Sequence, residues 1–334
     1  GRIIESNDAS GEKFAWPFAR DNVASRASVV VSEGVSAPSF PWGCESGEAV
    51  LEGPVFFTVR SPWVQRFRCQ FPSTTGESIR FARLFSEGKN AIIVAVDHGL
   101  YFGPLAGMIQ LPKVIDELEG ADGILMSPGM PAHCQSVFSK RGAPACIIRL
   151  NWGSNYAAMW QYKHSYSVPM ISAAEAVAQG ADIVIGSLTL KNPDEAEDAQ
   201  NVEVFADCVA QKRNLGIPLI GEVYPTGGDD MEPEDLQDEI FIGCRIIAEL
   251  GADLVKTFYT GKRFSEITAA TPVPVLALGA KKLPHESDAL QLAAKAVESG
   301  ARGIVFGRNI VQSENPARLL DALKEVVKEF QAPD

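Results

Sequence analysis

Eight short apolar runs that alternate with longer amphipathic segments predict a (β/α)8 TIM barrel, an α/β fold, over most of this 334-residue chain. The runs are almost continuously apolar, as expected for parallel strands that are buried on both faces. A hydrophobic content of 46% supplies enough side chains for a core of that size. The predicted strands occupy residues 91–96, 123–127, 145–150, 182–187, 218–224, 254–259, 273–278 and 303–307.

A weak internal repeat supports the count of eight strands. The segments EGADGILM, QGADIVIG, LGADLVKT and SGARGIVF, which begin at 119, 179, 250 and 299, all place Gly-Ala directly before a predicted strand. These are strands two, four, six and eight, so the repeating unit is a pair of βα modules. Helical spacing lies between the strands, at 78–87, 172–179, 194–213, 235–250, 286–299 and 315–330.

A doubly wound open sheet is the alternative architecture. It would need a phosphate or nucleotide loop close to the first strand. The first strand is followed instead by Asp97-His98-Gly99, with no G-x-G-x-x-G, and this favours the barrel. Residues 1–77 differ from the rest, because Pro, Gly, Ser and Trp are frequent and only short strands at 28–31 and 54–59 are indicated. We expect an N-terminal extension packed on a barrel of residues 78–334.

The composition excludes several classes of protein. A net charge of −12 argues against a nucleic-acid or anionic-membrane partner, and no run of 18 apolar residues could span a bilayer. The six cysteines form neither a C-x-x-C pair nor a disulfide framework, which favours reduced thiols in a cytoplasmic protein. The four histidines are dispersed, so we expect no metal site and no cofactor. A targeting segment removed before Gly1 stays possible.

Lys256 is the most informative residue, because it stands in the middle of the apolar run 254–259. A buried ammonium needs a justification, since the loss of its hydration is far more unfavourable than the burial of its methylenes is favourable. One explanation is a nucleophile: desolvation favours the neutral amine, which adds to a carbonyl to form a Schiff base. The other is structural, a lysine that reaches water or pairs with a carboxylate.

Two further polar residues stand at the carboxyl ends of predicted strands, where the active sites of such barrels lie. They are Asp97 after the first strand and Tyr224 at the end of the fifth. Asp97 could merely cap a helix, and Tyr224 could be an exposed rim residue. Together with Lys256 they suggest a mechanism in which the lysine forms an iminium, Tyr224 moves a proton and Asp97 orients substrate hydroxyls.

The last two predicted strands run into glycine-containing loops, Gly279-Ala280-Lys281-Lys282 and Gly307-Arg308-Asn309. Loops after strands seven and eight of these barrels often hold a phosphate on backbone N–H groups, and Arg308 and one of the lysines would add charge-assisted bonds. The alternative is a pair of turn glycines beside solvated basic residues. We expect a phosphorylated substrate.

The chain resembles the class I fructose-bisphosphate aldolases of the archaeal or DhnA type, within the DeoC/LacD aldolase group. Over residues 78–332, the resemblance is carried by VDHGLYFGPLAGM, GEVYPTGG, GADLVKTFYTG, PVPVLALGAKKLP and GIVFGRNIVQSENP. It implies a (β/α)8 barrel with Lys256 as the Schiff-base lysine, Tyr224 as the proton donor and acceptor and Asp97 as a substrate-binding acid. It further implies phosphate contacts at 279–282 and 307–308, no metal and a homo-oligomer, often a decamer.

The sequence departs from that family at three positions. The aldolases often have Trp two residues before the tyrosine and Arg two residues after it, where this chain has Glu222 and Thr226. Relatives have Gly-Gly where this chain has Gly279-Ala280. Because side chains alternate along a strand, Glu222 should face the barrel interior together with Tyr224. We hypothesise that it pairs with Lys256 or acts as a second base.

Other activities compete with the aldolase. The segments GAKKLP and GRNIVQSENP look very like the thiolase branch that acts on phosphorylated autoinducer-2 through the same lysine, although that branch lacks the Tyr-Pro seen at 224–225. A transaldolase-like aminodideoxy-heptulosonate synthase and a non-catalytic phosphosugar-binding barrel are further alternatives; the last gives Lys256 no reason to be buried. We expect an aldolase that interconverts fructose 1,6-bisphosphate with dihydroxyacetone phosphate and glyceraldehyde 3-phosphate.

Overall fold

The computed structural model describes residues 5–7, 13–15 and 74–328. The chain divides into two compact units, residues 1–57 and 58–334. In the first, β1 (Glu5–Asn7) and β2 (Lys13–Ala15) form an antiparallel hairpin. The strands predicted at 28–31 and 54–59 lie outside the described residues. The role of 1–77 as an extension therefore stays a prediction.

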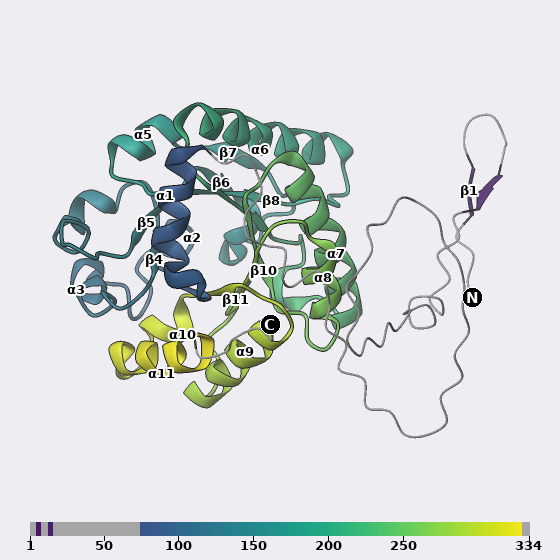
Figure 1. The fold of residues 1–334 in the computed structure, drawn as a ribbon. Coiled ribbons are helices and arrows are strands. Elements are labelled where there is room, and N and C mark those ends of the chain that lie inside the picture. The colour runs from purple at the N-terminus through teal and green to yellow at the C-terminus, as the bar shows by residue number, and fades with distance from the viewer. Residues whose placement is uncertain (1–4, 8–12, 16–73, 329–334) are drawn as a thin grey trace, which may run out of the picture. The chain divides into compact units, whose positions relative to one another are not determined.

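The second unit contains a closed barrel of eight parallel strands, each paired with the strands that precede and follow it in the barrel (Figure 1). Helices surround the strands, so the predicted (β/α)8 fold is confirmed. All eight predicted strands form, with ends that agree to within two residues. They are β3 (Ala91–Ala95), β4 (Gly123–Met126), β5 (Ala145–Arg149), β8 (Ile183–Leu188), β9 (Leu219–Val223), β10 (Leu254–Phe258), β11 (Val275–Leu278) and β12 (Gly303–Phe306).

The predicted helices also form, and local sequence explains where two of them begin. Thr74 and Ser172 are N-caps, each in a reciprocal capping box with a glutamate three residues later. The six are α1 (Thr75–Leu84), α5 (Ala173–Ala178), α6 (Glu195–Leu215), α7 (Pro233–Leu250), α9 (Glu286–Glu298) and α11 (Pro316–Lys328).

Several shorter elements were not predicted, because three to seven residues are few for a periodicity to show. A two-stranded hairpin, β6 with β7, follows the third barrel strand. These elements are α2 (Gly99–Phe102), α3 (Leu111–Asp116), α4 (Gln135–Phe138), β6 (Asn151–Gly153), β7 (Ser167–Pro169), α8 (Phe264–Ala270) and α10 (Arg308–Val311).

The interior of the barrel changes character along its axis. Its amino-terminal half is filled by aliphatic side chains from alternate strand positions, and Leu84 of α1 joins that cluster. Near the carboxyl ends of the strands the same inward direction is taken by charged residues: Arg149, Glu222 and Lys256, all buried. The alternation of side chains along a strand therefore places these charges inside the barrel.

The Gly-Ala-Asp repeat has a structural purpose at the amino-terminal ends of the strands. Asp122, Asp182 and Asp253 each stand before an even-numbered barrel strand and accept a hydrogen bond from a backbone N–H of the preceding strand. The other contact of each carboxylate is a basic side chain, Lys328, Arg83 and Lys212 respectively. The fourth copy has Arg302 instead, which donates to the backbone oxygen of Gly88.

Candidate active site

Lys256 lies on β10 with only 6% of its surface exposed, and its ammonium pairs with Glu222 on the neighbouring strand β9. The two residues are direct partners in the register of these parallel strands, so their side chains leave the sheet at the same level. The predicted pairing of Glu222 with Lys256 is therefore present. It also means that the ion pair alone explains why Lys256 is buried, as the structural interpretation had required.

Arg149, at the end of β5, links the two carboxylates of the site. It is 1% exposed; its Nε donates to Asp97 at 2.6 Å and its Nη2 donates to Glu222 at 2.5 Å. Three side chains on barrel strands and Asp97, two residues after β3, thus form one ion-pair chain, Asp97, Arg149, Glu222 and Lys256, with two carboxylates and two basic groups. Arg149 was not predicted as a site residue, although a basic residue within an apolar run, the signal that identified Lys256, is also present at this position.

The charges of this ion-pair chain keep the carboxylates of Asp97 and Glu222 ionised. Burial alone would raise the pKa of Glu222, but the nearby Arg149 and Lys256 outweigh burial, and the pKa lies below its usual range. The same balance acts on Asp97: burial raises its pKa, while Arg149, Lys256 and His98 lower it to a net value below the usual range. Because the two carboxylates are balanced by the two basic groups, the four polar side chains can be buried together.

Aromatic residues form one wall of the site. Tyr224 follows β9, is partly buried, and its ring packs in a tilted arrangement against Tyr156 and Phe258, with ring centroids 4.2 Å and 5.3 Å away. Tyr101 of α2 continues the wall, 4.8 Å from Tyr156. The Arg149 guanidinium lies 5.3 Å from the Tyr156 ring centroid, a cation–π distance. Lys256, Tyr224 and Asp97, which the sequence predicted to converge, line one cavity of about 80 Å³.

His98 also lines this cavity, directly after Asp97. Burial lowers its pKa to about 4, with the opposing effect of Asp97 smaller than that of burial, so the imidazole is neutral near pH 7. His98 was not predicted as a site residue from the sequence. Among the described residues, no cluster of three or more His, Cys, Asp or Glu side chains is arranged to hold a metal ion. No described helix is long and apolar enough to span a bilayer.

Some residues of the two loops that were predicted to bind phosphate line this cavity, and others do not. Gly279, Ala280, Gly307 and Arg308 line it, and Arg308 donates to the backbone oxygen of Ala280 at 2.9 Å. Lys281 and Lys282 are not among the lining residues. Their ammonium groups contact Asp230 and the backbone oxygen of Gln312, at exposed positions.

Backbone geometry marks both of these loops. Ala280 has φ +50°, a left-handed conformation that is unfavourable for a residue with a Cβ and easy for a glycine. At Gly307, a Cβ would come within 2.7 Å of the backbone oxygen of Ala95, so this glycine is needed for packing as well. The glycines therefore have structural reasons that do not depend on a phosphate.

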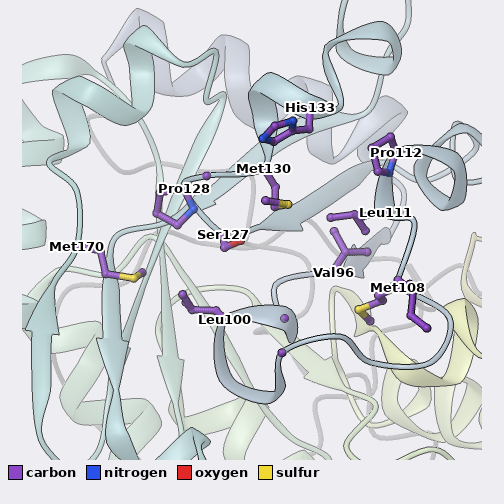
Figure 2. Close-up of a pocket in the computed structure, with 14 residues that line it drawn as sticks. Val96, Leu100, Met108, Leu111, Pro112, Ser127, Pro128, Met130, His133 and Met170 are labelled. Atoms are coloured by element: carbon purple, nitrogen blue, oxygen red, sulfur yellow. The ribbon is translucent and has the colours of Figure 1, made fainter.

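Figure 2 shows a second, larger cavity of about 680 Å³. Its lining is mostly apolar and includes Met108, Met130 and Met170. Helix α2 is the wall between the two cavities, because Gly99 and Leu100 face the larger one while Tyr101 and Phe102 face the cavity of Lys256. The ion-paired residues Asp97, Arg149, Glu222 and Lys256 line the smaller cavity and not the larger one.

Comparison with known proteins places this geometry in a family. The model of the DeoC/LacD family aldolases matches residues 91–313, which is two thirds of the chain and contains all eight barrel strands. The chain belongs to the DeoC/LacD aldolase family. It is thus an enzyme of the aldolase type, and the family resemblance seen in its sequence is confirmed.

The names of individual relatives of this DeoC/LacD member state two different activities, aldolase and thiolase. An uncharacterized aldolase of Saccharolobus solfataricus is 30% identical over 262 residues, covering 76% of this chain and 95% of the relative. The 3-hydroxy-5-phosphonooxypentane-2,4-dione thiolase of Yersinia pestis is 31% identical over 257 residues, covering 75% and 82%.

Among solved structures, an archaeal fructose 1,6-bisphosphate aldolase is 29% identical with a TM-score of 0.64, covering 76% of this chain and 99% of that one. A Schiff-base-forming fructose-1,6-bisphosphate aldolase is 28% identical with a TM-score of 0.62, covering 75% and 99%.

Proposed function

We propose that this protein is a class I aldolase that cleaves or forms a phosphorylated ketose through a Schiff base on Lys256, with fructose 1,6-bisphosphate as the substrate. One observation carries the proposal: a buried lysine at the carboxyl end of the barrel shares a hydrogen bond with a buried carboxylate and lines a cavity together with Tyr224. Similarity to the archaeal and Schiff-base-forming aldolases supports it.

The residues can perform each step of such a reaction. The Lys256 amine adds to the ketone carbon after its proton passes to Glu222, the carboxylate it already contacts. Loss of water from the carbinolamine gives an iminium, whose positive nitrogen accepts the electron pair released when the adjacent carbon–carbon bond breaks. Tyr224 takes the proton of the hydroxyl that becomes the aldehyde and returns a proton to the enamine carbon. Asp97 orients substrate hydroxyls.

The phosphate is assigned to the loops after β11 and β12. The backbone of Gly279, Ala280 and Gly307 borders the cavity, and the guanidinium of Arg308 stands beside them. A glycine-rich backbone and an arginine suit a phosphate dianion, since such bonds are charge-assisted. Because Lys281 and Lys282 contact other groups, we assign the cationic contact to Arg308.

Borohydride trapping tests the proposal. Incubation with fructose 1,6-bisphosphate and borohydride should add the reduced triose phosphate or hexose bisphosphate to Lys256, which peptide mass spectrometry locates. Release of triose phosphate from a panel of phosphorylated ketoses names the substrate, and chelation by EDTA should leave the rate unchanged. Retention of turnover in Lys256→Met would defeat the lysine assignment.

A lysine-dependent thiolase acting on a phosphorylated diketone is the second candidate. The 31% identity to the thiolases of Yersinia pestis and Salmonella typhimurium supports it, as do GAKKLP and GRNIVQSENP. Tyr224-Pro225 supports the aldolase instead. Acetyl transfer to coenzyme A without release of triose phosphate would select the thiolase.

A further inference from the structure

Arg149 uses only part of its guanidinium in the ion-pair chain. Its Nε and Nη2 hold Asp97 and Glu222, while its Nη1 is buried and has no hydrogen-bond partner within residues 74–328. A buried donor without a partner is unfavourable, and native proteins rarely retain one without a reason. Because Arg149 lines the cavity of Lys256, a bound ligand can supply the missing acceptor.

The placement of Arg149 indicates which part of a ligand it meets. Around the barrel, β10 has β9 on one side and β11 followed by β12 on the other. The loops assigned to the phosphate follow β11 and β12. Arg149 lies on β5, which is four strands from β11 in either direction around the barrel, so it stands across the barrel from the loop after β11.

We propose that Arg149 is a specificity-determining residue whose Nη1 donates to the hydroxyl on the ketose carbon next to the Schiff-base carbon, on the side away from the phosphate. This inference rests on the proposed function and deepens it, because it names the class of ketone that the site accepts. An α-hydroxyketone phosphate satisfies the buried Nη1. The corresponding deoxy ketone leaves it unpaired, and a site built to bind a hydroxyl rejects the analogue without it.

Two ketones test this directly. Dihydroxyacetone phosphate and hydroxyacetone phosphate both carry a phosphate and a ketone, and the second lacks the hydroxyl in question. The measurement is the concentration of each ketone that gives half-maximal borohydride trapping on Lys256. In the wild-type protein we expect this concentration to be about 10- to 100-fold higher for the deoxy ketone, the range of a lost charge-assisted hydrogen bond.

Variants at Arg149 then assign the discrimination to its side chain. In Arg149→Met, which has no donor, the ratio between the two ketones should fall to about one. Arg149→Lys keeps a cation between the two carboxylates but has a single nitrogen, so its ratio should also fall below that of the wild type. General damage to the site weakens both ketones alike and leaves the ratio intact. Arg245→Met, at an exposed arginine paired with Glu249, is the matched control that should keep the wild-type ratio.

The possible outcomes separate the inference from the proposed function. A ratio near one in the wild-type protein overturns the inference without any variant, so the test survives if Arg149→Met does not fold. A wild-type ratio that persists in the Arg149 variants also overturns it. Absence of any trapped adduct with either ketone defeats the Schiff-base function and this inference with it.

Discussion

The two ends of the barrel use the same chemical groups for different purposes. At the amino-terminal end, Asp122, Asp182 and Asp253 each accept one backbone N–H and contact one basic side chain, as three separate clamps. At the carboxyl-terminal end, two carboxylates and two cations are joined into one buried chain, in which Arg149 retains a donor without a partner.

The contacts of a buried charged residue therefore indicate whether its role is structural or functional. A clamp whose hydrogen bonds are satisfied by the backbone and a neighbouring cation has a structural role. A buried chain that borders a cavity and leaves a donor unused has capacity for a ligand. Substitutions at the two ends should therefore separate activity from stability.

The largest effect is expected for Lys256→Met. Loss of the nucleophile should lower kcat/KM by about 10⁴-fold or more, because no other described lysine lines the cavity and covalent catalysis is removed. Steady-state assays with a ketose bisphosphate and borohydride trapping measure this loss. A melting temperature close to that of the wild type would confirm that the chemistry alone is lost; substantial residual turnover would contradict the comparison.

Glu222→Gln should lower kcat by about 10²- to 10³-fold, since the amide cannot accept the Lys256 proton. The pKa of Glu222 is held below its usual range, so the wild-type carboxylate is ionised at neutral and mildly acidic pH. Any acid limb that it produces in the pH–rate profile therefore lies below about pH 4.5 and should vanish in the variant. An unchanged pH–rate profile in Glu222→Gln would remove its role as a base.

Asp253→Asn should affect stability and leave activity unchanged. The substitution removes the ion pair with Lys212, which is 5% exposed and would keep only Glu77 as a partner. We expect a loss of about 2 kcal/mol in the free energy of unfolding, measured by urea denaturation. A large fall in kcat with unchanged stability would contradict the assignment of a structural role to the amino-terminal end of the barrel.

One part of the pH dependence of stability should come from Asp97 and Glu222 at the carboxyl-terminal end. The pKa values of Asp97 and Glu222 are lowered from 3.8 and 4.5, so their stabilisation is fully present above these values. It is lost as the pH falls through the lower pKa values of the folded state. Urea denaturation between pH 7 and pH 3 should show the wild type losing stability relative to Glu222→Gln only below about pH 4.5. Loss of that relative stability already at pH 6 would contradict the lowered pKa.

The smallest effect is expected for Arg83→Met. Arg83 contacts Asp182, but 59% of its side chain is exposed, and exposed ion pairs contribute little. The free energy of unfolding should change by less than about 1 kcal/mol, and kcat should not change. Thermal unfolding and the standard assay check both. A loss of stability as large as that of Asp253→Asn would show that the exposure of the basic partner does not predict how much a clamp stabilises the fold.

Much of the fold was predictable from the sequence, and the site less so. The eight barrel strands and six of the helices were predicted because apolar runs and helical spacing are local signals. Lys256 was found because it interrupts such a run. Arg149 stands in the same kind of place, yet it was missed because it lies at the end of its strand, where a basic residue usually reaches solvent. Lys281 and Lys282 were expected to contact the phosphate, but their direction depends on Asp230 and Gln312, far away in the sequence.

Local sequence patterns were sufficient to predict that eight parallel βα units close into a barrel and that Lys256, Glu222 and Tyr224 stand near its carboxyl end, because alternation and burial follow from neighbouring residues. The contacts that join Asp97, Arg149, Glu222 and Lys256 became visible only in the folded molecule. These residues come from three strands and from the segment after β3, and the register and closure of the barrel bring their side chains together. Electrostatic pairing depends on distances across the barrel, which no local pattern encodes.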